Sequence, residues 1–134
     1  PSSLTARAEN FLAGNPDLHD PIRRLQAYRD SGADVLYAPG LSTREAIAEI
    51  VRSVDRPVNV LMGSPALRLT VDELAALGVR RISVGSALAR AALGAFLRAA
   101  REIRENGTFG FGADAVGYPE INAMFAAMPR VRNG

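Results

Sequence analysis

The sequence predicts an α/β fold in which four short strands alternate with four helices around a parallel sheet. Short apolar runs of strand length alternate with longer segments whose apolar residues recur at helical spacing. Glycine and proline punctuate the boundaries between these segments. Strands that alternate with helices are typical of parallel sheets with right-handed crossovers.

The four predicted strands differ in how strongly their composition favours a strand. The first has weak strand propensity, because it is rich in serine and alanine. The second and third are short, mainly apolar runs of the kind that forms buried strands, and the fourth is a shorter run that contains Ile82 and Val84. The predicted strands are residues 2–8 (SSLTARA), 33–38 (ADVLYA), 57–62 (PVNVLM) and 80–84 (RRISV).

Helix starts are predicted from capping residues. Asp20-Pro21 has the form of an N-cap followed by the first helical residue. Residues 42–45 (STRE) and 70–73 (TVDE) have the form of capping boxes for the second and third helices. Ser86 is the expected cap of a long fourth helix, which Gly107 ends.

The size of the repeating unit bears on the architecture. Each strand and helix together match one unit of a (β/α)8 barrel, which runs to about 250 residues. Four units in 134 residues therefore predict half of such a barrel, with a doubly wound sheet as the competing arrangement. We expect a half-barrel over 1–107 and a tail over 108–134, with a short helix that includes Ile121, Met124, Phe125 and Met128. Because the chain begins with Pro1 and the first strand follows at once, we interpret it as a fragment.

Composition excludes several kinds of chemistry. All 16 basic residues are arginine, which excludes a Schiff-base or P-loop lysine, and the absence of cysteine excludes a thiolate nucleophile. The single histidine, His19, excludes a histidine-rich metal site. The formal charge of +2 does not favour nucleic-acid binding, and no apolar run has the length of a membrane span. We expect a cytoplasmic protein that binds neither nucleic acid nor membrane.

Candidate site residues follow from the architecture alone. In a barrel or a doubly wound sheet, ligands bind at the carboxyl ends of the parallel strands. The residues at or just beyond those ends are Arg7, Glu9, Tyr37, Asn59, Gly63, Gly85 and Ser86.

These candidates each have a functional and a structural interpretation. Arg7 can bind a carboxylate or phosphonate with two parallel hydrogen bonds, or form a salt bridge with Glu9. Gly85-Ser86 can hold an anion at a helix N-terminus, or Ser86 can simply cap the helix. Asn59 can point into a barrel or bond to backbone, and Tyr37 is more often a packing residue.

Several stretches resemble the isocitrate lyase/phosphoenolpyruvate mutase family. Residues 5–14 (TARAENFLAG) resemble the family's fifth-strand motif. The same order continues through RRLQAYRDSGADVLYAPG, RPVNVLMG and LGVRRISVGSALARAAL, so the resemblance covers about 5 to about 108. It is closest to methylisocitrate-lyase-like and carboxyvinyl-carboxyphosphonate phosphorylmutase-like members.

The resemblance implies the C-terminal half of a (β/α)8 TIM barrel, with four βα units and a helical tail. It implies a Mg²⁺-dependent lyase or mutase that cleaves C–C or P–C bonds in small α-keto or hydroxy-carboxylates through an enolpyruvate-type intermediate. Arg7 matches the family's binder of substrate carboxylate or phosphonate, and Glu9 follows it near the site. The family's Mg²⁺ ligands lie on earlier strands, outside this chain. Family members form oligomers that exchange their last helix, so we expect a homo-oligomer through the helix near Ser86.

The sequence also departs from the family, so alternatives stay open. Lyases carry a cysteine on a mobile loop, and this chain has none. They also carry a glutamate at the end of the sixth strand, where this chain has residues 37–40 (YAPG), and Asn59 is offset from the family's asparagine. The lone chain is therefore expected to be inactive. One alternative is a non-catalytic remnant that binds an anion or self-associates, and another is a different phosphate-binding barrel that uses Gly63-Ser64 and Gly85-Ser86.

Overall fold

The computed structural model describes residues 3–14 and 17–127. The chain divides into two compact units, Pro1–Ala89 and Arg90–Gly134. The first unit holds the sheet and the second holds most of the longest helix and the segments after it. No helix of the described residues is both long enough and apolar enough to cross a membrane.

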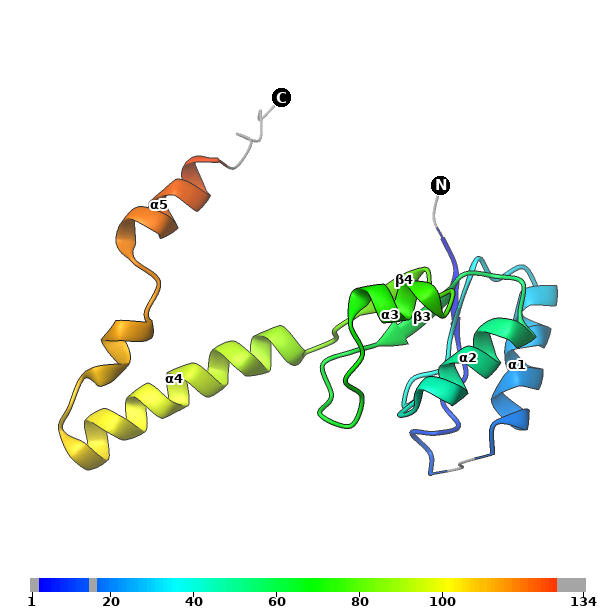
Figure 1. Ribbon diagram of the computed structural model, residues 1–134, viewed down its shortest axis with the longest axis horizontal. Helices are drawn as coiled ribbons and strands as arrows, with labels where there is room; N and C mark the ends of the chain where they lie inside the picture. Colours follow the sequence, from blue (N-terminus) through cyan, green and yellow to red (C-terminus); the bar gives the residue numbers. More distant parts are fainter. Residues whose placement is uncertain (1–2, 15–16, 128–134) are drawn as a thin grey trace. The chain divides into compact units, whose positions relative to one another are not determined.

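The first unit contains a four-stranded parallel sheet whose strand order follows the chain, β1-β2-β3-β4 (Figure 1). Each strand therefore pairs with its predecessor, and a helix lies between consecutive strands. The predicted α/β fold of four parallel strands alternating with helices is confirmed. The strands are β1 (Thr5–Arg7), β2 (Val35–Tyr37), β3 (Val58–Leu61) and β4 (Arg81–Ser83).

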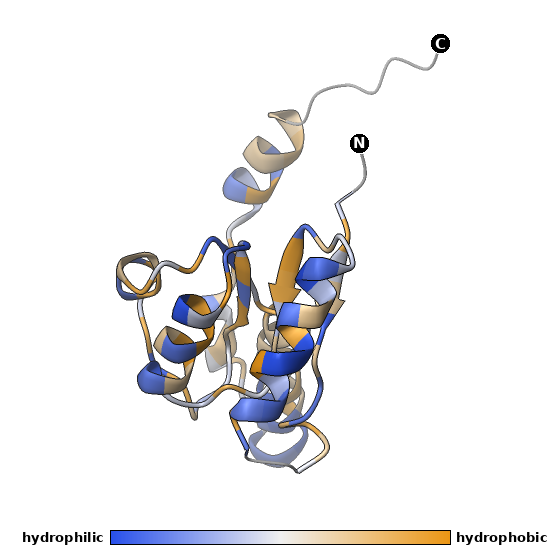
Figure 2. Ribbon diagram, turned by 90° about the vertical axis from the view of Figure 1, so that its right-hand side faces the viewer, coloured by the Kyte–Doolittle hydropathy of each residue, from blue (hydrophilic) through white to orange (hydrophobic). Residues whose placement is uncertain are grey.

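Helices α1 (His19–Asp30), α2 (Arg44–Ser53) and α3 (Val71–Ala76) connect these strands. Helices α1 and α2 contact each other and cover one face of the sheet. In Figure 2, their outer sides are mainly hydrophilic and hydrophobic residues gather toward the sheet. This amphipathic arrangement is what the helical spacing of apolar residues predicts.

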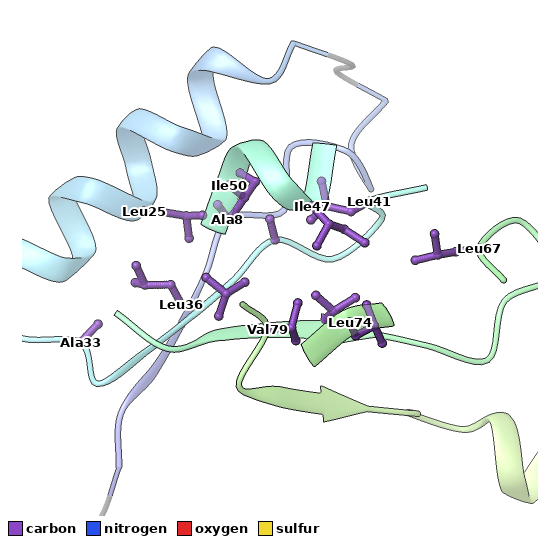
Figure 3. Packing of buried hydrophobic residues seen from close by; sticks show 13 residues of the cluster. Ala8, Leu25, Ala33, Leu36, Leu41, Ile47, Ile50, Leu67, Leu74 and Val79 are labelled. Atoms are coloured by element: carbon purple, nitrogen blue, oxygen red, sulfur yellow. The ribbon is translucent and has the colours of Figure 1, made fainter. Parts of the chain in front are cut away.

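The core lies between these helices and the sheet. Because side chains alternate along a strand, every second strand residue faces the helices. Figure 3 shows buried side chains from α1, α2 and β2 pointing toward one another. The most deeply buried core side chains are Leu25, Leu36, Ile47, Ile50, Leu74, Val58 and Val60, each with an exposed fraction of 1% or less. Burying an aliphatic side chain of this kind contributes about 1.5–3 kcal/mol.

The start of α1 differs from the prediction that Asp20 caps it. The helix begins at His19, and the residue before it, Leu18, makes no side-chain capping bond. Asp17 instead accepts a hydrogen bond from the His19 backbone N–H at 3.0 Å. Asp20 lies inside the first turn, where its carboxylate accepts from the Arg23 and Arg24 side chains. The prediction was wrong because the helix begins one residue before Asp20, whose carboxylate bonds to arginine side chains and not to the backbone of the first turn.

The two predicted capping boxes have different outcomes. At α3 the box is confirmed: Glu73 N–H donates to Thr70 Oγ1 at 3.1 Å, and Thr70 N–H donates to Glu73 Oε2 at 2.8 Å. At α2 the cap is Thr43, whose Oγ1 accepts from Ala46 N–H at 3.2 Å. The helix therefore starts one residue later than the predicted box at 42–45.

The second unit contains most of α4 (Ala87–Asn106), then η1 (Gly110–Asp114) and α5 (Tyr118–Ala126). Glu102 joins α4 to η1, because its carboxylate accepts from Thr108 Oγ1 and from the backbone N–H groups of Gly110 and Phe111. These donors, led by the Thr108 hydroxyl, lower the pKa of Glu102. The predicted tail helix corresponds to α5, although Met128 lies outside the described residues.

We predict that Gly40→Ala destabilises the first unit more than Gly32→Ala does. The two glycines have nearly equal positive φ, +93° and +94°, so the backbone cost of alanine is similar. A Cβ at Gly40 would lie 2.8 Å from Phe11 Cβ, whereas one at Gly32 meets nothing within 4 Å. The steric clash should add about 1–3 kcal/mol at Gly40. Urea unfolding of both variants measures this difference, and equal losses would contradict the packing described here.

A second prediction concerns stability in acid. Hydrogen bonding to Arg23 lowers the pKa of Asp20, and the Thr70 backbone N–H lowers the pKa of Glu73. Carboxyls with a depressed folded pKa bind protons more readily in the unfolded chain, so their stabilisation is lost as pH falls. We expect stability to decline below the usual values of 3.8 and 4.5. Glu73→Gln should reduce this decline in pH-dependent urea unfolding, and an unchanged slope would contradict it.

Candidate functional site

A row of polar side chains crosses the sheet from β1 to β4. The strand pairing places Arg7 beside Tyr37, Tyr37 beside Asn59, and Asn59 beside Arg81. Because paired residues of parallel strands point to the same face, these four share one face of the sheet. We call it the open face, and it is opposite to the face that α1 and α2 cover. Ser83, two residues after Arg81 on β4, belongs to the same face.

Arg7 ends β1 and makes two contacts on the open face. Its Nη2 forms an ion pair with Glu9 Oε1 at 2.7 Å, and its guanidinium carbon lies 5.2 Å from the centroid of the Tyr37 ring. The Arg7 and Glu9 side chains are 51% and 56% exposed, so their ion pair contributes only about 0–1 kcal/mol. The salt bridge considered for Arg7 is therefore present, but it holds the guanidinium weakly and in contact with solvent.

Asn59 is the one buried polar residue of the described chain, with an exposed fraction of 0%. Its Oδ1 accepts from Arg81 Nη1 at 3.1 Å, and its Nδ2 donates to Ser83 Oγ at 3.0 Å. A guanidinium has donors but no acceptor, so the Asn59 oxygen must face Arg81 and the amide nitrogen must face Ser83. Asn59 thus bonds to side chains of β4 on the open face.

The glycine candidates lie in the loops that follow β3 and β4. Gly63 has φ +95°, and a Cβ on it would lie 2.5 Å from the Cβ of Ala87, the first residue of α4. Gly85 has φ +50° and lies beside the Leu61 side chain. Gly85 and Ser86 are exposed and immediately precede α4. At Gly63, close packing against Ala87 is sufficient reason for a glycine.

The structure places the predicted site residues in three places: a group around Arg7, the hydrogen bonds of Asn59, and the loops after β3 and β4. Arg7, Glu9 and Tyr37 contact one another at one end of the row. The hydrogen bonds of Asn59 go to β4 residues. Sequence reasoning missed Arg81 and Ser83 as its partners. Their signal is the alternation in residues 80–84 (RRISV), where two polar residues flank Ile82 and so share a face.

The open face does not fit Mg²⁺ in the part of the chain that the structure describes. Mg²⁺ needs carboxylate and other oxygen ligands. The described residues contain no group of three or more histidine, cysteine, aspartate or glutamate side chains able to hold a metal. Along the open face, the carboxylate of Glu9 is already paired with Arg7, and Arg81 adds a further positive charge. No step through a metal follows from these residues.

A separate pocket of about 290 Å³ lies where the loops after β1 and β2 meet the start of α2. Phe11, Leu18, Leu41 and Thr43 are among the residues that line it. None of the predicted site residues does so. This pocket is therefore distinct from the open face.

The family model for phosphoenolpyruvate phosphomutase matches residues 1–104. The chain belongs to this family, within the phosphoenolpyruvate mutase/isocitrate lyase superfamily. The predicted resemblance is confirmed. An uncharacterised protein of Mycobacterium tuberculosis is 35% identical over 103 residues, which are 76% of this chain and 39% of that protein.

Two solved structures show what the fold resembles. A Burkholderia cenocepacia protein provisionally described as a lyase/mutase is 61% identical, with a TM-score of 0.90 over 95% of this chain and 46% of that one. A phosphonopyruvate hydrolase is 28% identical, with a TM-score of 0.72 over 92% of this chain and 45% of its own. The chain therefore spans about half the length of these relatives and matches part of their TIM barrels.

Substitution of Asn59 and of Arg7 tests which of the two side chains stabilises the folded first unit. Asn59→Ala should destabilise the first unit by about 1–3 kcal/mol, because it removes a buried group that satisfies two neighbours. Arg7→Gln should change stability by at most about 1 kcal/mol, because its ion pair is exposed. Chemical denaturation of both variants provides the comparison. A loss at Arg7 as large as that at Asn59 would mean that Arg7 is a structural residue.

Proposed function

We propose that this chain is the substrate-binding half of a lyase or mutase that acts on small α-keto or hydroxy-carboxylates. The superfamily includes enzymes for small carboxylates and phosphonates, which supports this class of substrate. The proposed reaction cleaves or forms a C–C or P–C bond through an enolpyruvate-type intermediate. Within this proposal, residues 1–107 supply βα units five to eight of the barrel, and 108–134 form the tail.

The observation that carries the proposal is the position of Arg7. It ends β1, and ligands of parallel α/β enzymes bind at the carboxyl ends of strands. Its guanidinium is half exposed, and Glu9 engages Nη2 alone in the ion pair. The remaining N–H donors can therefore bind two oxygens of a carboxylate or phosphonate through parallel hydrogen bonds.

Glu9 and Tyr37 support Arg7 from two directions. Glu9 pairs with one edge of the guanidinium, and the Tyr37 ring lies against its face at 5.2 Å. Because the ion pair is exposed and weak, these contacts keep the guanidinium near the strand end without preventing it from turning toward an incoming anion.

The other candidate residues take secondary roles in this proposal. Asn59 holds the polar surface beside Tyr37 on the open face. Gly63, Gly85 and Ser86 lie in the loops before α4, where backbone N–H groups can bind a second anionic group of the substrate. Mg²⁺, when bound in a complete site, would stabilise negative charge on the enolate oxygens. Its ligands would come from outside this chain, because the open face does not fit the ion.

A second candidate function is a non-catalytic unit that binds an anion without turnover. The observation that favours it is the absence, among the described residues, of a carboxylate cluster able to hold a metal. The family match argues against the third possibility, an unrelated phosphate-binding barrel. We also propose self-association of the chain, for which the exposed apolar residues of α4, such as Leu88 and Phe96, provide a surface.

Calorimetry with oxalate, a small planar dicarboxylate, tests the proposed role of Arg7. The chain should bind oxalate without Mg²⁺, and Arg7→Gln should weaken binding about tenfold or more, as expected for loss of a charge-assisted bidentate contact. Arg104→Gln is the matched control, because Arg104 is also an exposed arginine paired with a neighbouring glutamate. Equal affinities for the two variants would rule out Arg7 as the anion binder. Tight Mg²⁺ binding by the chain alone would contradict the placement of the metal ligands elsewhere.

A further inference from the structure

Glu9 places a carboxylate beside the guanidinium that is proposed to bind the substrate anion. Its Oε1 lies 2.7 Å from Nη2 of Arg7, and in the part of the chain that the structure describes Arg7 is its ion-pair partner. The two residues are two positions apart at the end of β1, so this contact belongs to a single strand end and needs no other element of the fold. An anion that binds the guanidinium therefore also meets the carboxylate of Glu9.

The backbone on both sides of Glu9 is held in place. Before it, Ala8 is buried, and its N–H donates to the backbone oxygen of Tyr37 at 2.9 Å. After it, the side-chain amide of Asn10 donates to the carboxylate of Asp20 in the first turn of α1. These two anchors fix the Cα of Glu9 beside the strand end, so only its side-chain torsions remain free to adjust to a ligand.

The two side chains have opposite hydrogen-bonding capacities. A guanidinium only donates hydrogen bonds, and an ionised carboxylate only accepts them. A ligand that satisfies both must therefore turn acceptor oxygens toward Arg7 and a hydrogen-bond donor toward Glu9. A 2-hydroxycarboxylate has this arrangement on adjacent carbon atoms, because its carboxylate accepts and its hydroxyl donates.

Ligands with acceptors alone fit the pair less well. A 2-oxocarboxylate presents a carbonyl oxygen where the hydroxyl would be, and oxalate presents a second carboxylate. Either group brings negative charge toward Glu9 without a proton to share, so their contact is repulsive. Discrimination of this kind depends on the repulsive element as well as on the attractive one. Because Arg7 and Glu9 are half exposed, water screens the repulsion and the preference is moderate.

We propose that Glu9 is a specificity-determining residue that selects 2-hydroxycarboxylates over 2-oxocarboxylates. Arg7 binds the carboxylate of the ligand, and Glu9 accepts a hydrogen bond from the adjacent hydroxyl. The inference rests on the anion binding by Arg7 proposed above and narrows its ligand from small oxyanions in general to those with a neighbouring hydroxyl donor.

The test compares lactate with pyruvate, which differ in that lactate has a hydroxyl where pyruvate has an oxo group. Nuclear magnetic resonance titration of the full 134-residue chain measures both dissociation constants, even in the millimolar range. Lactate should bind about fivefold more tightly or better, as expected for a solvent-screened hydrogen bond to a charged acceptor. Glu9→Gln should remove most of this preference and strengthen the binding of pyruvate, because it removes the negative charge.

Glu49→Gln is the matched control, because Glu49 is also an exposed glutamate paired with an arginine at 2.7 Å, but it lies on α2. It should change the ratio of the two dissociation constants by less than about twofold. Equal binding of lactate and pyruvate to the unsubstituted chain would overturn the proposal, and so would an unchanged ratio in Glu9→Gln. If Arg7→Gln still weakened the binding of both anions, the proposed role of Arg7 would stand while that of Glu9 fell. If Arg7→Gln had no effect, or neither anion bound, both proposals would fall.

Discussion

The alternation of side chains along four short parallel strands is the constraint on which the rest of this structure depends. One set of strand residues, represented by Leu36 and Val58, faces α1 and α2 and forms the core. The other set, from Arg7 through Tyr37 and Asn59 to Arg81, forms a polar row on the open face. Because a strand residue can point to only one face, the apolar core and the polar row lie on opposite sides of the sheet.

The polar row itself has two parts with different energetics. At one end, Arg7 and Glu9 form an exposed pair, which solvent screens and a ligand can rearrange. In the middle, Asn59 is fully buried and its amide is oriented by Arg81 and Ser83. The guanidinium of the first part is exposed, and the proposed anion binding depends on it. The amide of the second part is fixed by two hydrogen bonds.

Much of the fold and part of the site could be predicted from local pattern. The alternation of strand and helix segments, the capping box at Thr70–Glu73 and the position of Arg7 at a strand end are all local, because each depends on residues adjacent in sequence. The start of α1 could not be predicted in this way. Asp17 and Asp20 have similar capping chemistry, and only the folded turn shows that Asp20 bonds to Arg23 and Arg24.

The sequence by itself determined the fold class, the family resemblance and the candidate residues at the strand ends, because periodicity and motif order are properties of the chain. The tertiary structure alone decided which candidates meet. Arg7 contacts Tyr37 across 30 residues, and Asn59 contacts Ser83 with a sequence separation of 24. Such contacts depend on the register between strands, which is set by the packing of the whole sheet against its helices.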